Sequence, residues 1–325
     1  MRFVSFHSFG DAHQLYFDEG EIPQTGEHQL LVKTKAIALN RADILQRQGK
    51  YPPPAGESAV LGLEIAGEIV SIGSKVSKWK IGEPVCGLLA GGGYAEYALM
   101  HEQLAMPIPK GLNFQEAAAI PEAFLTAWQA LHWQANLKNG QRVLVHAAAS
   151  GVGSAALQLI KKAGAEAIAV ASSEKHDLCK KLGASLTIDY KKESFANHIL
   201  KKYGSEGVHI IIDFIGAAHW EQNLSCLGID GTMITLGFLG GGAPQTIPIQ
   251  TLLQKRWTIR GTTLRNRDIH YKAKLTADLV KHTWNDFAEG HLTPVIGKTF
   301  PWEEVISAHL WMESNKSQGK IILIL

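Results

Sequence analysis

The stretch Arg142–Gly153, which reads RVLVHAAASGVG, decides the fold of this chain. Its first half is an apolar run typical of a buried strand, and apolar periodicity predicts a helix over Val152–Ala163. Glycines lie in the turn that joins the two. A tight strand–helix turn needs glycine even without a ligand. The same order is also typical of a dinucleotide site, because free N–H groups and the helix dipole favour a pyrophosphate. The candidate nucleotide-binding residues are Ser150, Gly151 and Val152.

The segments that follow this turn favour the nucleotide-binding interpretation. Strands and helices alternate, and the strands are continuously apolar, which indicates a parallel, doubly wound sheet with helices on both faces. The predicted strands are Ala167–Ala171, Leu186–Asp189, Val208–Ile215 and Thr232–Leu236, with Trp257–Thr263 as a sixth. The predicted helices are Glu122–Gln134, Glu174–Leu182, Ser194–Tyr203 and Ile269–Ala288.

The residues after the second predicted strand bear on the choice between NADH and NADPH. An NAD site places an acidic residue there, against the ribose 2′-hydroxyl. This chain has Ser172 at that position, with Glu174 and Lys175 close behind. Ser172 and Lys175 can bind a 2′-phosphate, which favours NADPH unless Glu174 points inward. The alternative is that Ser172 caps the helix and Lys175 is a solvated helix residue.

The first ~120 residues have a different pattern, with short strands between glycine and proline turns. They predict a β-rich, barrel-like domain that gives way to the alternating pattern after Pro121. The predicted strands are Gln29–Ala38, Glu64–Ser71, Gly82–Leu89, Tyr94–Met100 and, at the end of the chain, Gly319–Leu325.

Composition narrows the classes of function. The chain has 325 residues, with 32 Lys+Arg against 30 Asp+Glu and a net charge of +2, so about two domains and no nucleic-acid or membrane partner are expected. Its three cysteines, Cys86, Cys179 and Cys226, form no CxxC pair and are too few for a disulfide framework. No signal peptide is recognisable, so we expect a cytoplasmic protein.

Several motifs together resemble the zinc-independent quinone oxidoreductases of the medium-chain dehydrogenase/reductase superfamily, and within it the tumour-suppressor-inducible subfamily. The segments that carry the resemblance are Ala38–Asp43 (ALNRAD), Gln46–Pro54 (QRQGKYPPP), Leu61–Glu64 (LGLE), Gly92–Tyr97 (GGYAEY), Ala118–Ala123 (AAIPEA) and His146–Gly153 (HAAASGVG). The resemblance implies a GroES-like catalytic domain formed by residues 1–122 and 264–325, and a Rossmann domain formed by residues 123–263.

The resemblance also implies which residues face the substrate and the nicotinamide. Asn40, Asp43 and Tyr51 match the family's cleft: Asn40 and Tyr51 would donate hydrogen bonds to substrate or cofactor, and Asp43 would orient either one. The alternative is that Asn40 closes a turn and Asp43 caps a helix. The further implied cofactor contacts are Thr126, Tyr190, Gly216, Gly237, Phe238 and, beside a position where relatives carry arginine, Lys316.

Positions that bind zinc in related enzymes differ here. Asn40 stands where those enzymes have cysteine and Leu63 where they have histidine, and their four-cysteine structural lobe is absent. Only Glu64 is retained, for which we expect a structural hydrogen-bonding role, whereas a catalytic zinc needs three protein ligands. Without a Lewis acid the acceptor must be electrophilic itself, such as a quinone or an α,β-unsaturated carbonyl.

The leading interpretation is therefore an NADPH-dependent, metal-free quinone oxidoreductase. The alternatives are an enoyl or enone reductase and a non-catalytic NADPH-binding protein. The resemblance and the exposed edge that a strand at Trp257–Thr263 would present also predict a homodimer.

Overall fold

The computed structural model describes residues 1–243, 246 and 248–325. The chain divides into two compact units. Unit 1 consists of Met1–Leu125 and Leu264–Leu325, and unit 2 of Thr126–Thr263. No helix in the described part of the chain combines the length and the apolar character that crossing a membrane requires.

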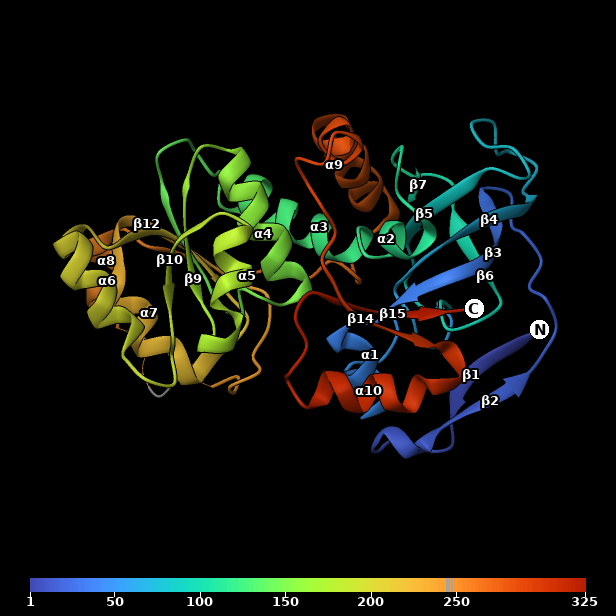
Figure 1. The fold of residues 1–325 in the computed structure, drawn as a ribbon, viewed down its shortest axis with the longest axis horizontal. Coiled ribbons are helices and arrows are strands. Elements are labelled where there is room, and N and C mark those ends of the chain that lie inside the picture. The colour runs from blue at the N-terminus through green and yellow to red at the C-terminus, as the bar shows by residue number, and fades with distance from the viewer. Residues whose placement is uncertain (244–245, 247) are drawn as a thin grey trace. The chain divides into compact units, whose positions relative to one another are not determined.

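Unit 2 is built on a six-stranded sheet in which all pairs of neighbours are parallel (Figure 1). In spatial order its strands are β10 (Ala184–Ile188), β9 (Glu166–Val170), β8 (Arg142–Val145), β11 (Val208–Asp213), β12 (Leu227–Thr235) and β13 (Thr258–Gly261). The first strand in the sequence, β8, lies in the middle, and later strands are added first on one side of it and then on the other, as in a Rossmann fold. The predicted doubly wound sheet and its sixth strand are confirmed.

The helices of unit 2 follow the predicted alternation with some differences. They are α4 (Gly151–Lys162), α5 (His176–Lys181), α6 (Phe195–Tyr203), α7 (Trp220–Cys226) and α8 (Ile249–Lys255). The predicted helix Glu122–Gln134 is two elements, the α-helix α3 (Pro121–Trp128) and the π-helix η2 (Gln129–Gln134). The predicted helix at Glu174 begins as a 3₁₀ turn, because the Ser173 backbone N–H and hydroxyl both bind Asp189.

Unit 1 is the predicted β-rich, GroES-like domain. Its larger sheet runs β14 (Ile296–Pro301), β15 (Lys320–Ile324), β3 (Gln29–Ala38), β4 (Glu64–Ile72), β5 (Pro84–Leu88), β7 (Ala105–Pro107), with β6 (Tyr97–His101) paired to β3. A separate hairpin joins β1 (Arg2–Phe6) and β2 (Leu15–Glu19). Because β15 pairs antiparallel with β3, both ends of the sequence contribute to one sheet.

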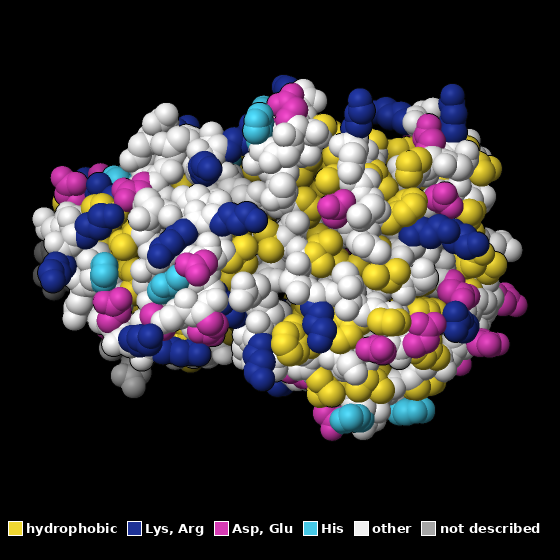
Figure 2. Space-filling view, viewed as in Figure 1, with side chains coloured by type: hydrophobic (Ala, Val, Ile, Leu, Met, Phe, Trp, Pro, Cys, Tyr) yellow, Lys and Arg dark blue, Asp and Glu magenta, His cyan; other side chains and the backbone are white. Residues whose placement is uncertain are grey.

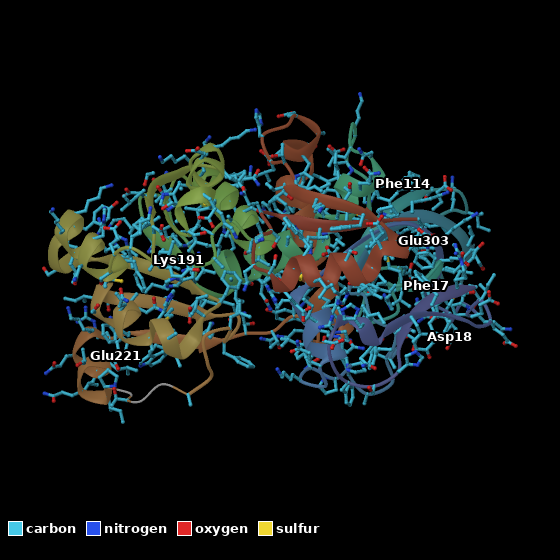
Figure 3. All side chains as sticks on the ribbon, turned by 60° about the horizontal axis from the view of Figure 1, so that its bottom comes forward. Phe17, Asp18, Phe114, Lys191, Glu221 and Glu303 are labelled. Atoms are coloured by element: carbon cyan, nitrogen blue, oxygen red, sulfur yellow. The ribbon has the colours of Figure 1, made fainter. Side chains whose placement is uncertain are left out.

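Four α-helices lie wholly within unit 1: α1 (Arg41–Arg47), α2 (Phe114–Ala118), α9 (Ile269–Ala288) and α10 (Val305–Glu313). Helix α9 has the predicted bounds, whereas β14 and α10 were not predicted. Figure 1 shows α1 and α10 side by side. Phe17 on β2, labelled in Figure 3, packs edge-on against Trp302 with 4.7 Å between ring centroids, which joins the hairpin to the C-terminal segment.

Charged side chains of both signs are interspersed on the surface. On the face shown in Figure 2, Lys and Arg side chains alternate with Asp and Glu side chains. This distribution agrees with the net charge of +2. It offers no extended basic track for a nucleic acid on that face.

Candidate active site

The glycine turn of unit 2 has the geometry of an anion-binding helix start. Ser150 is the N-cap of α4, and its hydroxyl accepts a hydrogen bond from Gly153 N at 3.1 Å. A Cβ atom on Gly153 would lie 2.4 Å from Ala147 O, so only glycine allows the helix to start this close to the turn. The first N–H groups of a helix have no partner within it, and here those of Gly151 and Val152 come directly after the cap. This cradle fits a pyrophosphate.

The residues expected to bind the 2′-phosphate lie at the end of β9. Ser172 is buried, and its hydroxyl donates to Glu174 Oε1 at 2.5 Å. Burial lowers the pKa of Lys175, and Glu174 partly opposes that shift. The hydrogen bond from Ser172 lowers the pKa of Glu174, and the charges of Lys191 and Lys175 lower it further. The site thus holds two carboxylates beside its lysines, because Asp189 accepts from Ser173 N at 3.1 Å. The expected contacts of Ser172 and Lys175 with a phosphate stay predictions.

The other predicted cofactor residues of unit 2 follow strands β10, β11 and β12. Tyr190 follows β10, is 46% exposed and packs edge-on against the His219 ring. Gly216 has φ +76°, and its N–H donates to Asp213. Gly237 and the exposed Phe238 follow β12. Since the carboxyl ends of parallel strands share one sheet edge, the structure brings these residues to the same edge as the glycine turn.

A pair of histidines, the buried His146 and the half-buried His219, lies at this edge and was not predicted. His146 Nε2 lies 2.6 Å from Asn223 Oδ1, so this nitrogen carries the proton. His146 Nδ1 therefore accepts from His219 Nδ1 at 3.2 Å. Burial lowers the pKa of both rings to about 4, so the pair is neutral at physiological pH. The signal in the sequence is a histidine at the end of an otherwise apolar strand.

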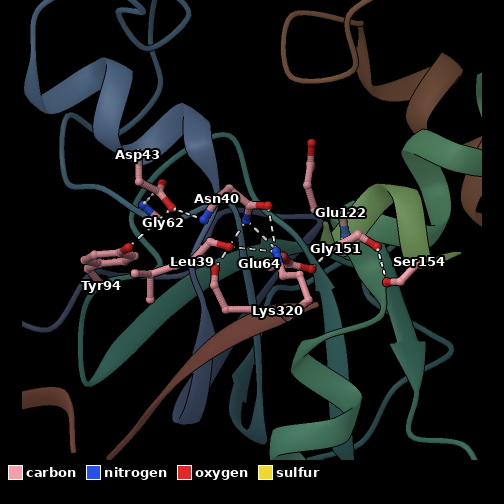
Figure 4. A network of polar contacts seen from close by, with 11 residues as sticks. Leu39, Asn40, Asp43, Gly62, Glu64, Tyr94, Glu122, Gly151, Ser154 and Lys320 are labelled. Atoms are coloured by element: carbon pink, nitrogen blue, oxygen red, sulfur yellow. Dashed lines mark hydrogen bonds and ion pairs between the residues drawn. The ribbon is translucent and has the colours of Figure 1, made fainter. Parts of the chain in front are cut away.

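In unit 1 both polar atoms of the predicted Asn40 side chain make hydrogen bonds within the protein. Its amide Nδ2 donates to Glu64 Oε1 at 2.9 Å and to Ala38 O at 3.2 Å, and its Oδ1 accepts from Lys320 Nζ at 2.7 Å (Figure 4). Donation by Asn40 to a ligand would require one of these bonds to break. The geometry favours the turn-closing alternative for this residue.

Lys320 and Glu64 form a buried ion pair at the centre of the same network. Lys320 Nζ lies 2.6 Å from Glu64 Oε1, with side chains 5% and 0% exposed, and also donates to Leu39 O at 2.8 Å. The second Glu64 oxygen accepts from Glu122 N at 2.7 Å, near the start of α3. The expected structural role of Glu64 is confirmed. Lys320 was missed, although a lysine that opens an apolar strand is a recognisable signal.

Asp43 is also buried, and its contacts are to the protein. Its carboxylate accepts from Asn40 N at 2.8 Å, Gly62 N at 3.1 Å and the Tyr94 hydroxyl at 3.3 Å, rather than from Tyr51. Burial raises its pKa to about 6. Asp43 therefore lies in the first turn of α1 and forms a capping box with the N-cap Asn40, whereas the structural alternative expected it to cap a helix that begins at Ile44. A contact of Asp43 with a ligand stays a prediction.

A chain of buried polar groups continues from Asp43 to the surface. Arg47 always donates, so His309 Nδ1 accepts from it at 3.1 Å, and His309 Nε2–H then donates to the Tyr94 hydroxyl. Burial, helped by Arg47, lowers the pKa of His309 to about 3. Arg47 in turn binds the half-buried Glu313 at 2.5 Å. This chain ties α1 to α10.

Tyr51 is the third predicted catalytic residue, and no hydrogen bond from its hydroxyl is found among the described residues. Its side chain is half-buried, and burial, together with Glu122, raises its pKa, whereas Arg265 lowers it. The Arg265 guanidinium carbon lies 5.4 Å from the centroid of the Tyr51 ring. No pattern in the sequence indicates Arg265, which is more than 200 residues from Tyr51.

The last two predicted residues lie on different units. Thr126 is nearly buried on α3 at the start of unit 2. Lys316 is exposed on unit 1, next to Asn315, whose Oδ1 accepts from Arg41 at 2.9 Å. Their contacts with a cofactor stay predictions. Within the described residues no group of three or more His, Cys, Asp or Glu side chains is arranged to hold a metal ion.

Comparisons with known proteins agree with both halves of this architecture. Residues 26–110 match the family model "Alcohol dehydrogenase GroES-like domain", and residues 151–280 match "Zinc-binding dehydrogenase". The chain is 33% identical to "Quinone oxidoreductase-like protein 2 homolog" of Nematostella vectensis, covering 94% of this chain and 84% of that protein. It is 31% identical to the quinone oxidoreductase of Homo sapiens, covering 100% and 98%.

Solved structures point to the same group of enzymes. The Escherichia coli quinone oxidoreductase complexed with NADPH has a TM-score of 0.90 and 28% identity, with full coverage of both chains. The CurK enoyl reductase has a TM-score of 0.89 and 26% identity, covering 99% of this chain and 98% of the other.

Proposed function

This chain belongs to the medium-chain dehydrogenase/reductase superfamily, and on that premise we propose that it is an NADPH-dependent quinone oxidoreductase that uses no catalytic metal. The observation that carries the proposal is the Glu64–Lys320 ion pair. Glu64 is the only retained counterpart of a zinc ligand, and a lysine ammonium neutralises it. Asn40 and the buried, apolar Leu63 occupy the other two positions. This donor set does not fit zinc.

The cofactor part of the proposal rests on the sheet edge of unit 2. The helix start at Gly151 would hold the pyrophosphate, and Lys175 with Lys191 would hold the 2′-phosphate of NADPH. Tyr190 and Phe238 are exposed at the same edge and would contact the nucleotide. When bound, NADPH supplies a hydride from its nicotinamide ring.

The substrate part of the proposal rests on what unit 1 offers. With Asn40 and Asp43 committed to hydrogen bonds within the protein, Tyr51 is the predicted residue left to donate a proton to a reduced acceptor. An acceptor that is electrophilic by itself needs only this proton and correct placement. Similarity over the full length to quinone oxidoreductases of a bacterium and a mammal favours a quinone.

A second candidate is an enoyl or enone reductase, since the CurK enoyl reductase has nearly the same fold. The same hydride geometry with Tyr51 as acid would serve an α,β-unsaturated thioester. A panel of acceptors separates the candidates: NADPH oxidation is followed with 9,10-phenanthrenequinone, 1,4-benzoquinone and crotonyl-CoA. We expect turnover of the quinones. Turnover of crotonyl-CoA alone would establish the second candidate, and tight NADPH binding without turnover would indicate a non-catalytic protein.

We further propose a homodimer joined through unit 2. Strand β13 lies at the edge of the six-stranded sheet, where its unpaired backbone groups can pair with a second copy. Helix α8 exposes Ile249 and Leu253, at 73% and 74%, one turn apart. Sedimentation at micromolar concentration should give a dimer, and Leu253→Lys should shift it toward monomer. A monomeric wild-type protein would rule this proposal out.

A reducing, cytosolic setting is part of the same proposal. Cys86, Cys179 and Cys226 are all buried free thiols. Burial raises the pKa of each, so these thiols are poor nucleophiles and suit a compartment in which no disulfide is needed. Fractionation of cells that express the tagged protein tests the compartment directly.

A further inference from the structure

Arg265 is a buried cation whose position is fixed by three separate segments of unit 1. The residue is 5% exposed and follows the first residue of the returning chain, Leu264. Its Nε donates to Ala90 O at 2.8 Å, and its Nη2 donates to Gln46 Oε1 at 2.7 Å. These bonds hold the guanidinium in place without using a carboxylate. No carboxylate among the residues that the structure describes neutralises the guanidinium directly, so its positive charge can act on the neighbouring aromatic ring.

That group is the ring of Tyr51. The guanidinium carbon is 5.4 Å from the ring centroid, within the range of a cation–π contact. A longer contact of 3.5 Å joins Nη1 to the Tyr51 carbonyl oxygen, so Arg265 touches both the backbone and the ring of this residue. Arg265 thus restricts where the phenol hydroxyl can point.

The charges around the phenol have opposing effects. Burial and Glu122 raise the pKa of Tyr51, and Arg265 lowers it. Arg265 itself lies near Asp43, Glu57 and Glu122, and Lys272 Nζ contacts its carbonyl oxygen at 3.5 Å. Of the charged groups acting on the phenol, Arg265 is the one that favours its ionised form.

We propose that Arg265 is a positioning residue for Tyr51, whose guanidinium aligns the phenol and stabilises the phenolate that forms when Tyr51 gives up its proton. This inference rests on the proposed function of Tyr51 as the proton donor. The acceptor is reduced by the hydride while the cofactor is oxidised. The Tyr51 O–H bond then breaks as an O–H bond forms on the acceptor oxyanion, and the phenolate takes a proton back from water. A cation over the ring stabilises the phenolate more than the neutral phenol.

The matched variants are Arg265→Gln, Arg265→Lys and Arg267→Gln. Arg267 is a suitable control because its guanidinium lies 4.6 Å from a different ring, that of Tyr271. The first measurement needs no turnover: the phenol of Tyr51 is titrated by ultraviolet difference absorption, with Tyr51→Phe in each background as the blank. We expect Arg265→Gln to raise the pKa of Tyr51, Arg265→Lys to preserve most of the effect, and Arg267→Gln to leave it unchanged.

The second measurement is the pH profile of kcat with a quinone. Arg265→Gln should lower kcat by about tenfold or more and move its basic limb to higher pH, with the Kd of NADPH unchanged. An unchanged Tyr51 titration in Arg265→Gln, or a lower kcat with an unmoved pH profile, would overturn the proposal. If Arg265→Gln does not fold, Arg265→Met takes its place as the neutral variant, and equal Tyr51 titrations in Arg265→Met and Arg265→Lys would do the same. Full activity of Tyr51→Phe would instead refute Tyr51 as the donor, while the titration would still report on the contact between Arg265 and the ring.

Discussion

The two units build their polar sites in opposite ways. At the sheet edge of unit 2, backbone N–H groups, glycines and partly exposed side chains such as Tyr190 leave room for a ligand. At the centre of unit 1, the side chains of Asn40, Asp43, Glu64 and Lys320 are bound to one another or to the backbone. The difference teaches that polar residues at family positions can have their hydrogen bonds satisfied within the protein. In unit 1 they bind backbone groups of Leu39, Asn40, Gly62 and Glu122.

The largest expected effect comes from breaking the ion pair of unit 1. Lys320→Met leaves the Glu64 carboxylate buried without a counter-ion, which should lower the free energy of unfolding by about 3–5 kcal/mol. Urea denaturation measures the change. The exposed Lys316→Met is the control and should have little effect. The double variant Lys320→Met/Glu64→Gln should recover much of the loss. If Lys320→Met were as stable as the wild type, the pair could not be what holds this region together.

A second test of unit 1 uses the pKa of Asp43, which burial raises to about 6 from a value of 3.8 in the unfolded chain. At a pH between these two pKa values, Asp43 is protonated in the folded state and ionised in the unfolded state. Stability therefore falls as pH rises through this window, by up to about 3 kcal/mol from this group. Asp43→Asn removes the titration.

The measurement compares the free energies of unfolding of wild type and Asp43→Asn at pH 4 and pH 7. The wild type should lose about 2–3 kcal/mol relative to the variant between the two. Asp177→Asn, a carboxyl-to-amide change on an exposed residue, should show no such difference. Parallel pH dependences for Asp43→Asn and wild type would mean that Asp43 is already ionised throughout.

In unit 2 the backbone of the glycine turn is the sensitive feature. Gly153→Ala places a Cβ 2.4 Å from Ala147 O, which should cost about 2 kcal/mol of stability and shift the start of α4. NADPH binding, measured by fluorescence titration, should weaken together with stability. Gly261→Ala is the control, because a Cβ there meets no atom within 4 Å. Normal NADPH binding by Gly153→Ala would remove the turn from the proposed cofactor site.

The same difference explains how far the sequence predicted the molecule. The glycine turn, the strands of unit 2 and helix α9 follow from local patterns, because apolar periodicity and turn residues act between near neighbours. Lys320 and Arg265 could not be predicted this way. Their partners Asn40 and Gln46 lie 280 and 219 residues away, and only the return of the C-terminal segment to unit 1 brings them together.

The prediction of secondary structure also failed where local sequence patterns do not decide the structure. Strand β14 reads IGKTFP and buries only Phe300, so it has no apolar run or alternation, and its pairing with β15 is what makes it a strand. The π-helix after α3 replaces a predicted continuous helix, because apolar spacing does not distinguish the two. For Asp43 the sequence supports a functional and a structural interpretation equally, and three donors within the protein agree with the structural one.

The smallest expected effect tests the choice of cofactor at unit 2. Lys175→Glu replaces a proposed phosphate contact by a repulsive charge, so the Kd of NADPH should rise by about 10–100-fold while that of NADH changes little. Lys180→Glu makes the same charge change on the exposed face of α5 and should affect both cofactors weakly. Because Glu174 already binds Ser172 in this site, Glu174→Gln should act in the opposite direction and tighten NADPH. Equal weakening of both cofactors by Lys175→Glu would place Lys175 away from the 2′-phosphate, and the preference for NADPH would then have to arise outside unit 2.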